Sequence, residues 1–134
     1  MTATREELRH GLLLDGLIEP VNLARIHSEV RRLNPSKSEA QWQQETLAVI
    51  RSLVGDGLMD VGYLGDRFVP KPLDEIMPVI QDAYITHYRD TGGWVFSYWL
   101  NLTDKGRQVA LSTEEGRRVA EHEKRRRASL RRQR

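Results

Sequence analysis

Residues 48–62 read AVIRSLVGDGLMDVG and contain the clearest change of structure in the chain. The first part continues a helical pattern that begins at Ser38, a suitable N-cap with Gln41 three residues later, as in a capping box. Apolar residues then recur at helical spacing. A Gly-Asp-Gly run ends this pattern, and the apolar stretch after it is typical of a strand. The stretch therefore predicts a helix over 38–54 and a strand over 58–64.

Two more helices are predicted upstream. Leucines at helical spacing favour a helix over 4–15, which Gly16 would end. A second helix is predicted over 20–33, because Pro20 suits a first turn and a largely one-sided apolar stripe follows it.

The pattern downstream alternates between loops and regular elements. Residues 66–72 hold two prolines and are predicted to form a loop, and a helix is expected over 74–89. The aromatic and β-branched run over 94–102 predicts a second strand. A last helix is expected through Val109 and to continue into the basic C-terminal segment.

One α+β unit over residues 20–112 is the expected core of the protein. The side chains expected to be mostly buried in it are Trp42, Leu47, Ile50, Leu53, Leu58, Ile80, Phe96, Leu100 and Leu102.

Two motifs resemble winged helix-turn-helix domains. The stretch over 48–62 resembles a recognition helix that runs into the first wing strand, and WLNLTDKGRQVAL at 99–111 resembles the return strand and the following helix. The resemblance implies a winged-helix-like α+β fold with three N-terminal helices, a two- or three-stranded antiparallel wing sheet and a C-terminal helix. The segment GDRFVPKPLDEI at 65–76 resembles uncharacterised actinobacterial proteins, and no activity comes with that resemblance.

The spacing of the two motifs departs from the winged-helix pattern. A typical wing is a short hairpin, whereas roughly forty residues separate the motifs here, including the predicted helix over 74–89. A helix inserted between the wing strands would cover the surface that normally meets DNA.

Charge is divided unevenly along the chain. Residues 117–134 contain nine Lys or Arg and two Glu, a net charge of +7, whereas residues 1–116 carry −5. The sequence therefore predicts an acidic winged-helix-like domain over 1–116 and a basic tail or helix extension over 117–134.

No residue pattern points to catalysis, a cofactor or a metal. The chain has no cysteine, and it lacks a GxSxG, Walker or GxGxxG motif. His10, His27, His87 and His122 lack the spacing of metal ligands, and we expect three surface or boundary histidines and one in the tail. The polar N-terminal segment and the absence of a long apolar run favour a cytoplasmic protein outside the membrane.

Three sets of residues are candidates for binding. The candidate recognition-helix contacts are Gln41, Gln43, Gln44, Glu45 and Arg51. Trp99 is the candidate exposed aromatic residue, because it lies between Ser97 and Asn101 on the more polar face of its predicted strand. The basic tail offers Lys124, Arg125, Arg126, Arg127, Arg131 and Arg132.

These features favour a protein-binding adaptor or an immunity-type partner that neutralises a basic toxin. The alternative is a winged-helix transcription regulator that binds DNA through the tail or helix 38–54. Glutamine can read adenine in the major groove, but phosphate contacts need Lys or Arg, and this helix has only one arginine among its exposed candidates.

Overall fold

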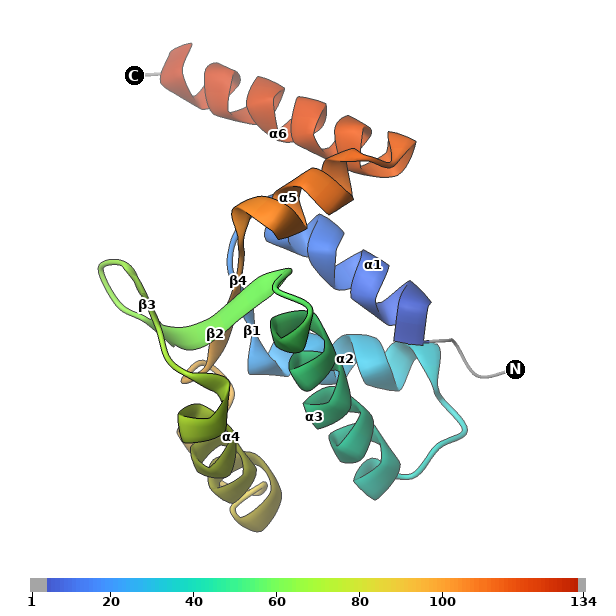
Figure 1. The fold of residues 1–134 in the computed structure, drawn as a ribbon, viewed down its shortest axis with the longest axis vertical. Helices are drawn as coiled ribbons and strands as arrows, with labels where there is room; N and C mark the ends of the chain where they lie inside the picture. Colours follow the sequence, from blue (N-terminus) through green and yellow to red (C-terminus); the bar gives the residue numbers. More distant parts are fainter. Residues whose placement is uncertain (1–4, 133–134) are drawn as a thin grey trace.

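The computed structural model describes residues 5–132 and is an α+β fold of helices around one antiparallel sheet. Helices α1 (Arg5–Gly16), α2 (Leu23–Leu33) and α3 (Glu39–Gly55) precede the strand β2 (Met59–Leu64) (Figure 1). Ser38 and Gln41 form the expected capping box, with Ser38 Oγ accepting from the Gln41 amide. Gly57, with φ 74°, adopts the left-handed backbone that ends α3, as the Gly-Asp-Gly run predicts.

The sheet has four strands in the order β1-β4-β2-β3, more than the two or three predicted. The expected antiparallel pairing of the strand over 58–64 with the later aromatic run is confirmed, with Val61 opposite Leu100. The strand β1 (Val21–Asn22) stands where a helix was predicted to begin, and Asn22 caps α2 instead. The short strand β3 (Phe68–Pro70) occupies the predicted loop, where it pairs with β2.

The segment between β3 and β4 (Trp99–Leu102) differs from its prediction in two places. The predicted helix over 74–89 is α4 (Leu73–Gln81) followed by one π-helical turn, η1 (Asp82–Thr86). The predicted strand over 94–102 is a strand only from Trp99 onward, and a 3₁₀ turn, η2 (Thr91–Gly93), comes before it. We call residues 71–98 the insert, because they lie between the paired strands.

The core lies between the sheet, α1, α2, α3 and α4. Six of the nine predicted core residues are buried, and Trp42 and Leu102 are half-buried. Phe96 is 70% exposed, so its placement in the core was wrong. The physical reason is that residues 94–98 do not form a strand, so Phe96 does not share a face with the buried Trp94 and Tyr98.

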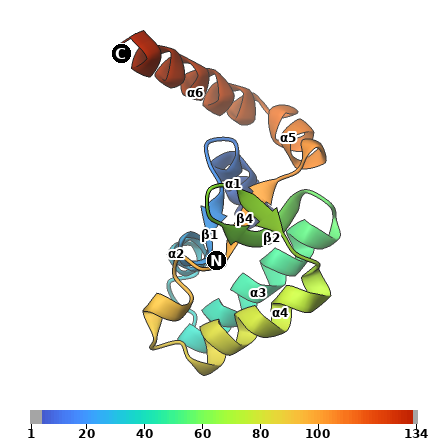
Figure 2. The same cartoon turned by 90° about the vertical axis from the view of Figure 1, so that its left-hand side faces the viewer.

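Two helices follow the sheet. Helix α5 (Asp104–Leu111) is capped by Thr103, and helix α6 (Glu114–Arg132) contains most of the basic segment. The predicted boundary at residue 116 falls inside α6, so the described part of the basic segment is helical. Figures 1 and 2 show α6 at one end of the molecule, with its C-terminal half reaching beyond the other elements.

Candidate partner-binding surfaces

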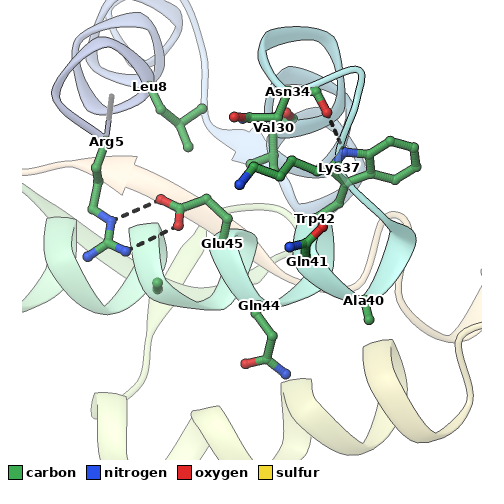
Figure 3. A pocket seen from close by; sticks show the side chains of 11 residues that line it. Arg5, Leu8, Val30, Asn34, Lys37, Ala40, Gln41, Trp42, Gln44 and Glu45 are labelled. Carbon is green, nitrogen blue, oxygen red and sulfur yellow. Dashed lines mark hydrogen bonds and ion pairs between the residues drawn. The ribbon is translucent and has the colours of Figure 1, made fainter. Parts of the chain in front are cut away.

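Helix α3 was expected to present five contact residues, but three of them are engaged within the protein. Gln41 Oε1 accepts from the Ser38 amide in the capping box. Glu45 forms a two-pronged ion pair with Arg5 of α1, at 2.9 and 3.1 Å (Figure 3). Gln43 is buried, so its assignment as an exposed contact was wrong.

The burial of Gln43 follows from the position of the insert. Its Nε2 donates to the main-chain oxygen of Tyr84 at 3.2 Å, which links α3 to η1. A buried amide side chain needs such partners, because an unsatisfied polar group costs free energy in a low-dielectric interior. Gln44 and Arg51 are exposed on α3, and so is Gln41, whose side chain is engaged in the capping box.

A shallow pocket opens beside α3, between this helix, α1 and the end of α2 (Figure 3). Trp42 donates from Nε1 to the main-chain oxygen of Asn34 at 2.8 Å, which fixes the indole at one side of the pocket. The Arg5–Glu45 ion pair borders the other side. The polar groups at both sides of the pocket are therefore already engaged within the protein, and Lys37 and Gln44 also line it.

Five rings meet where the insert joins α2 and α3, and we call them the aromatic junction: His27, Trp42, Tyr84, Tyr88 and Trp94. His27 lies at its centre, with Nδ1 2.5 Å from the Tyr84 hydroxyl and Nε2 3.1 Å from the Tyr88 hydroxyl. Trp94 stacks on Tyr88 with ring centres 5.3 Å apart and contacts Tyr84 edge-on at 4.8 Å. The junction therefore fastens η1, through Tyr84, and the segment after it, through Tyr88 and Trp94, to α2.

His27 was expected at the surface or at a boundary, and that expectation was wrong. It is 8% exposed, because it falls on the buried stripe of α2 together with Leu23, Ile26 and Val30. The helical spacing of these four residues is visible in the sequence, and it is the signal that could have predicted the burial of His27. Two neutral hydroxyls satisfy the ring, since a neutral imidazole offers one donor and one acceptor.

The environment of His27 favours its neutral form. Burial lowers the pKa of His27 below 6.5, and the nearby Arg31 guanidinium lowers it further, against an opposing effect of the Glu39 carboxylate. Burial has the opposite effect on the two tyrosines: it raises the pKa values of Tyr84 and Tyr88, so both hydroxyls stay protonated. A charged His27 could only donate hydrogen bonds, so protonation would oblige both hydroxyls to accept.

This pKa shift predicts a pH-dependent stability. The folded pKa of His27 lies below its value of 6.5 in the unfolded chain, so the unfolded state takes up more protons in acid. We expect this contribution to be complete above pH 6.5 and to be lost as the pH falls from 6.5 through the folded pKa. The measurement is urea denaturation from pH 8 to pH 5, compared with His27→Gln, which removes the titration, and with His122→Gln as a control at an exposed site. An equal pH dependence in the wild type and in His27→Gln would contradict the assignment.

Helix α4 lies alongside α3, and the hydrogen bond from Gln43 to Tyr84 links α3 to the turn that follows α4 (Figure 2). Ile76 and Ile80 of α4 are buried in the core, whereas Asp74 and Glu75 of α4 are exposed, as is Asp82, the first residue of η1 directly after α4. We call the exposed sides of these two helices the α3–α4 face. Residues 39–86 carry eight acidic and three basic side chains, a net charge of −5. The expected acidity of the body is therefore concentrated in this region.

Trp99 is half-buried rather than an exposed contact, so that assignment was also wrong. Its Nε1 donates to the main-chain oxygen of Phe96 at 3.0 Å, and it lies opposite Asn22 and Gly62 in the sheet. A central position in β4, between β1 and β2, accounts for its partial burial. Phe96 is the most exposed large apolar side chain within residues 5–132.

The six basic candidates of the C-terminal segment all lie on α6, and all of them are exposed. Two of them differ from the rest: Arg126 and Arg127 both contact the buried carboxylate of Glu123, at 2.6 and 3.1 Å. The other four, Lys124, Arg125, Arg131 and Arg132, make no contact with Glu123 in the described part of the chain.

The described part of the chain contains neither a candidate metal site nor a candidate membrane-spanning helix. Within residues 5–132, no group of three or more His, Asp or Glu side chains could hold a metal ion. None of the helices there has the length and apolar character needed to cross a membrane.

No known protein family, curated protein or solved structure matches this chain. The evidence about its function therefore lies in its own surfaces.

Proposed function

We propose that the protein is a non-catalytic binding protein on a winged-helix-like scaffold, and that its α3–α4 face binds a protein partner with a basic surface. The pairing of β2 with β4 supports the scaffold, because these are the strands that a wing would contribute. The partner would be of the immunity type, in which an acidic protein neutralises a basic one.

The observation that carries this proposal is the position of α4 beside α3. The major groove of B-DNA is about 12 Å wide and admits one helix, whose diameter is about 10–12 Å. Packed helices lie about 8–10 Å apart, so two together are roughly 20 Å across. With α4 held alongside it through Gln43 and Tyr84, α3 does not have the clearance that a groove-reading helix needs.

Charge supports the same conclusion. DNA affinity comes largely from Lys and Arg at phosphates, and Arg51 is the one basic residue of α3. The carboxylates of Asp74, Glu75 and Asp82 would lie next to any phosphate that approached the α3–α4 face. The same carboxylates favour encounter with a basic protein, since complementary potentials raise association rates and disfavour partners of like charge.

Affinity capture with the full chain tests the proposal. An acid-reversal variant, Asp74→Lys with Glu75→Lys and Asp82→Lys, is compared with a control that carries Glu6→Lys, Glu19→Lys and Glu114→Lys. The control changes the net charge equally, and two of its positions, Glu6 and Glu114, lie in helix first turns as Asp74 and Glu75 do, where lysine is unfavourable. We expect a basic protein to be retained after nuclease treatment by the wild type and the control, and to be lost from the acid-reversal variant. Equal retention by both variants, or retention of DNA alone, would contradict the proposal.

A transcription regulator is the second candidate, favoured by the order of helices and strands and by the basic α6. It would need Gln44 and Arg51 to read base edges, because the other three candidate contacts are engaged within the protein. Cross-linking from position 44 separates the two candidates, because a regulator would give an adduct with DNA there and an immunity-type protein an adduct with its partner.

A further inference from the structure

Helix α6 carries its cations in two parallel rows. Arg117, Lys124 and Arg131 are seven residues apart, and so are Arg118, Arg125 and Arg132, which follow each of them by one position. Seven residues are nearly two helical turns, so each row runs along one side of the helix. All six side chains are exposed, and we call these two rows the basic face of α6.

The acidic residues of α6 leave most of this face cationic, since Glu114 and Glu115 lie in the first turn, before the rows begin. Glu123 is buried, and its carboxylate is held by Arg126 at 2.6 Å and by Arg127 at 3.1 Å. Hydrogen bonds from Arg126, helped by those from Arg127, hold the pKa of Glu123 down at about 2 against the effect of burial. Glu121 is the one carboxylate among the two rows, and it contacts Arg125 at 3.5 Å.

A second copy of this chain is a poor occupant for the basic face. Helices that pair with each other need a continuous apolar seam, because buried apolar area drives the association. Within residues 114–132, Leu130 is the one strongly exposed large apolar side chain, and Val119 is half-buried. Two such faces would also bring like charges together.

We propose that the basic face of α6 binds the phosphate backbone of duplex DNA without reading its sequence. The rows match this ligand in charge and in length: successive cations in a row are about 10.5 Å apart, and a row spans about 21 Å, the rise of roughly six base pairs. Five of the six cations are arginines, whose forked guanidinium groups fit phosphate oxygens in pairs.

The rest of the molecule restricts this contact to α6. The exposed carboxylates of Asp74, Glu75 and Asp82 lie on or next to the α3–α4 face, and residues 73–86 contain no Lys or Arg, so this face is repelled by the duplex that α6 attracts. The C-terminal half of α6 reaches beyond the other elements, which lets it lie along a backbone while the acidic face points elsewhere (Figure 2). This inference goes beyond the proposed protein partner and does not depend on it.

The test is the salt dependence of binding to mixed-sequence duplex DNA, measured with the full chain. The row variant carries Arg118→Gln, Arg125→Gln and Arg132→Gln, and glutamine keeps good helix propensity at these exposed sites. The control carries Arg51→Gln, Arg67→Gln and Lys71→Gln, which removes the same charge from exposed positions on α3 and the β2–β3 region. The circular dichroism of both variants shows whether α6 is still helical.

With six phosphate contacts, the affinity of the wild type should fall about 10³-fold between 50 and 200 mM salt, a log–log slope of about −5. The row variant should retain about three contacts, with a slope near −2.7 and a fall of about 40-fold over the same range. The control variant should match the wild type. The proposal is overturned if the wild type does not bind the duplex at 50 mM salt, or if the control variant loses as much affinity for the duplex as the row variant does. It is also overturned if poly-glutamate of equal charge binds the protein as tightly as the duplex.

Discussion

Tyr84→Ala should lower the free energy of unfolding by about 3–5 kcal/mol, the usual cost of removing a large buried aromatic side chain. Tyr84 is fully buried at 0% exposure and contacts His27, Tyr88 and Trp94 in the aromatic junction. Removing it leaves a cavity and also leaves His27 Nδ1 without its hydroxyl partner. The measurement is equilibrium urea denaturation at pH 7.5, where His27 is neutral.

Tyr84→Phe is the matched control, because it keeps the ring and removes only the hydroxyl. The expected loss is about 1–3 kcal/mol, since one buried nitrogen of His27 loses its partner. Amide exchange adds a local readout: α4 should exchange faster in Tyr84→Ala than in Tyr84→Phe, because the junction holds the insert on α3. A loss below about 1 kcal/mol in Tyr84→Ala, far under the usual cost, would show that the junction does not fasten the insert.

Gly106→Ala should destabilise the protein by about 3 kcal/mol, the upper end of the usual cost of overpacking. Gly106 lies in the first turn of α5, where the helix passes close to the end of α3 and the start of β2. A Cβ there would overlap the main-chain oxygen of Leu58 and lie 2.8 Å from its carbonyl carbon. Main chain cannot move aside as a side-chain tip does, so α5 would have to shift away from the sheet.

Gly11→Ala should have the opposite effect on the stability of the same protein. Gly11 is inside α1 and has open space where a Cβ would be placed, so alanine should stabilise the helix by up to about 1 kcal/mol. The two variants, compared by thermal denaturation, should therefore move the melting temperature in opposite directions. A shift of the same sign in both would contradict the close approach of α5 to Leu58.

The sequence predicted those elements whose signals are local. The capping box at Ser38 and the Gly-Asp-Gly run define both ends of α3 from neighbouring residues alone. Strand β1 has only two residues, and its existence depends on pairing with Trp99 and Leu100, far along the chain. No local sequence pattern predicts such a strand. The aromatic run before Trp99 has high strand propensity, but its first residues serve the aromatic junction and the turn that precedes β4.

The candidate site was predicted less completely for a related reason. Gln43 is polar and lies on a helix with exposed neighbours, so its side chain was expected to face solvent. It is buried because Tyr84, forty-one residues later, brings a main-chain oxygen to it. His27 differs, since its position on the apolar stripe of α2 was readable and only its polar partners were not.

The most direct test of the central claim is to identify what touches α3 in the cell. A photo-cross-linking amino acid replaces Gln44, which is exposed on α3, and a control variant carries it instead at Gln108, which is exposed on α5. The account predicts a covalent adduct with a protein at position 44 that survives nuclease treatment and is absent at position 108. A nuclease-sensitive adduct with DNA at position 44 would contradict the account and make α3 a DNA-reading helix.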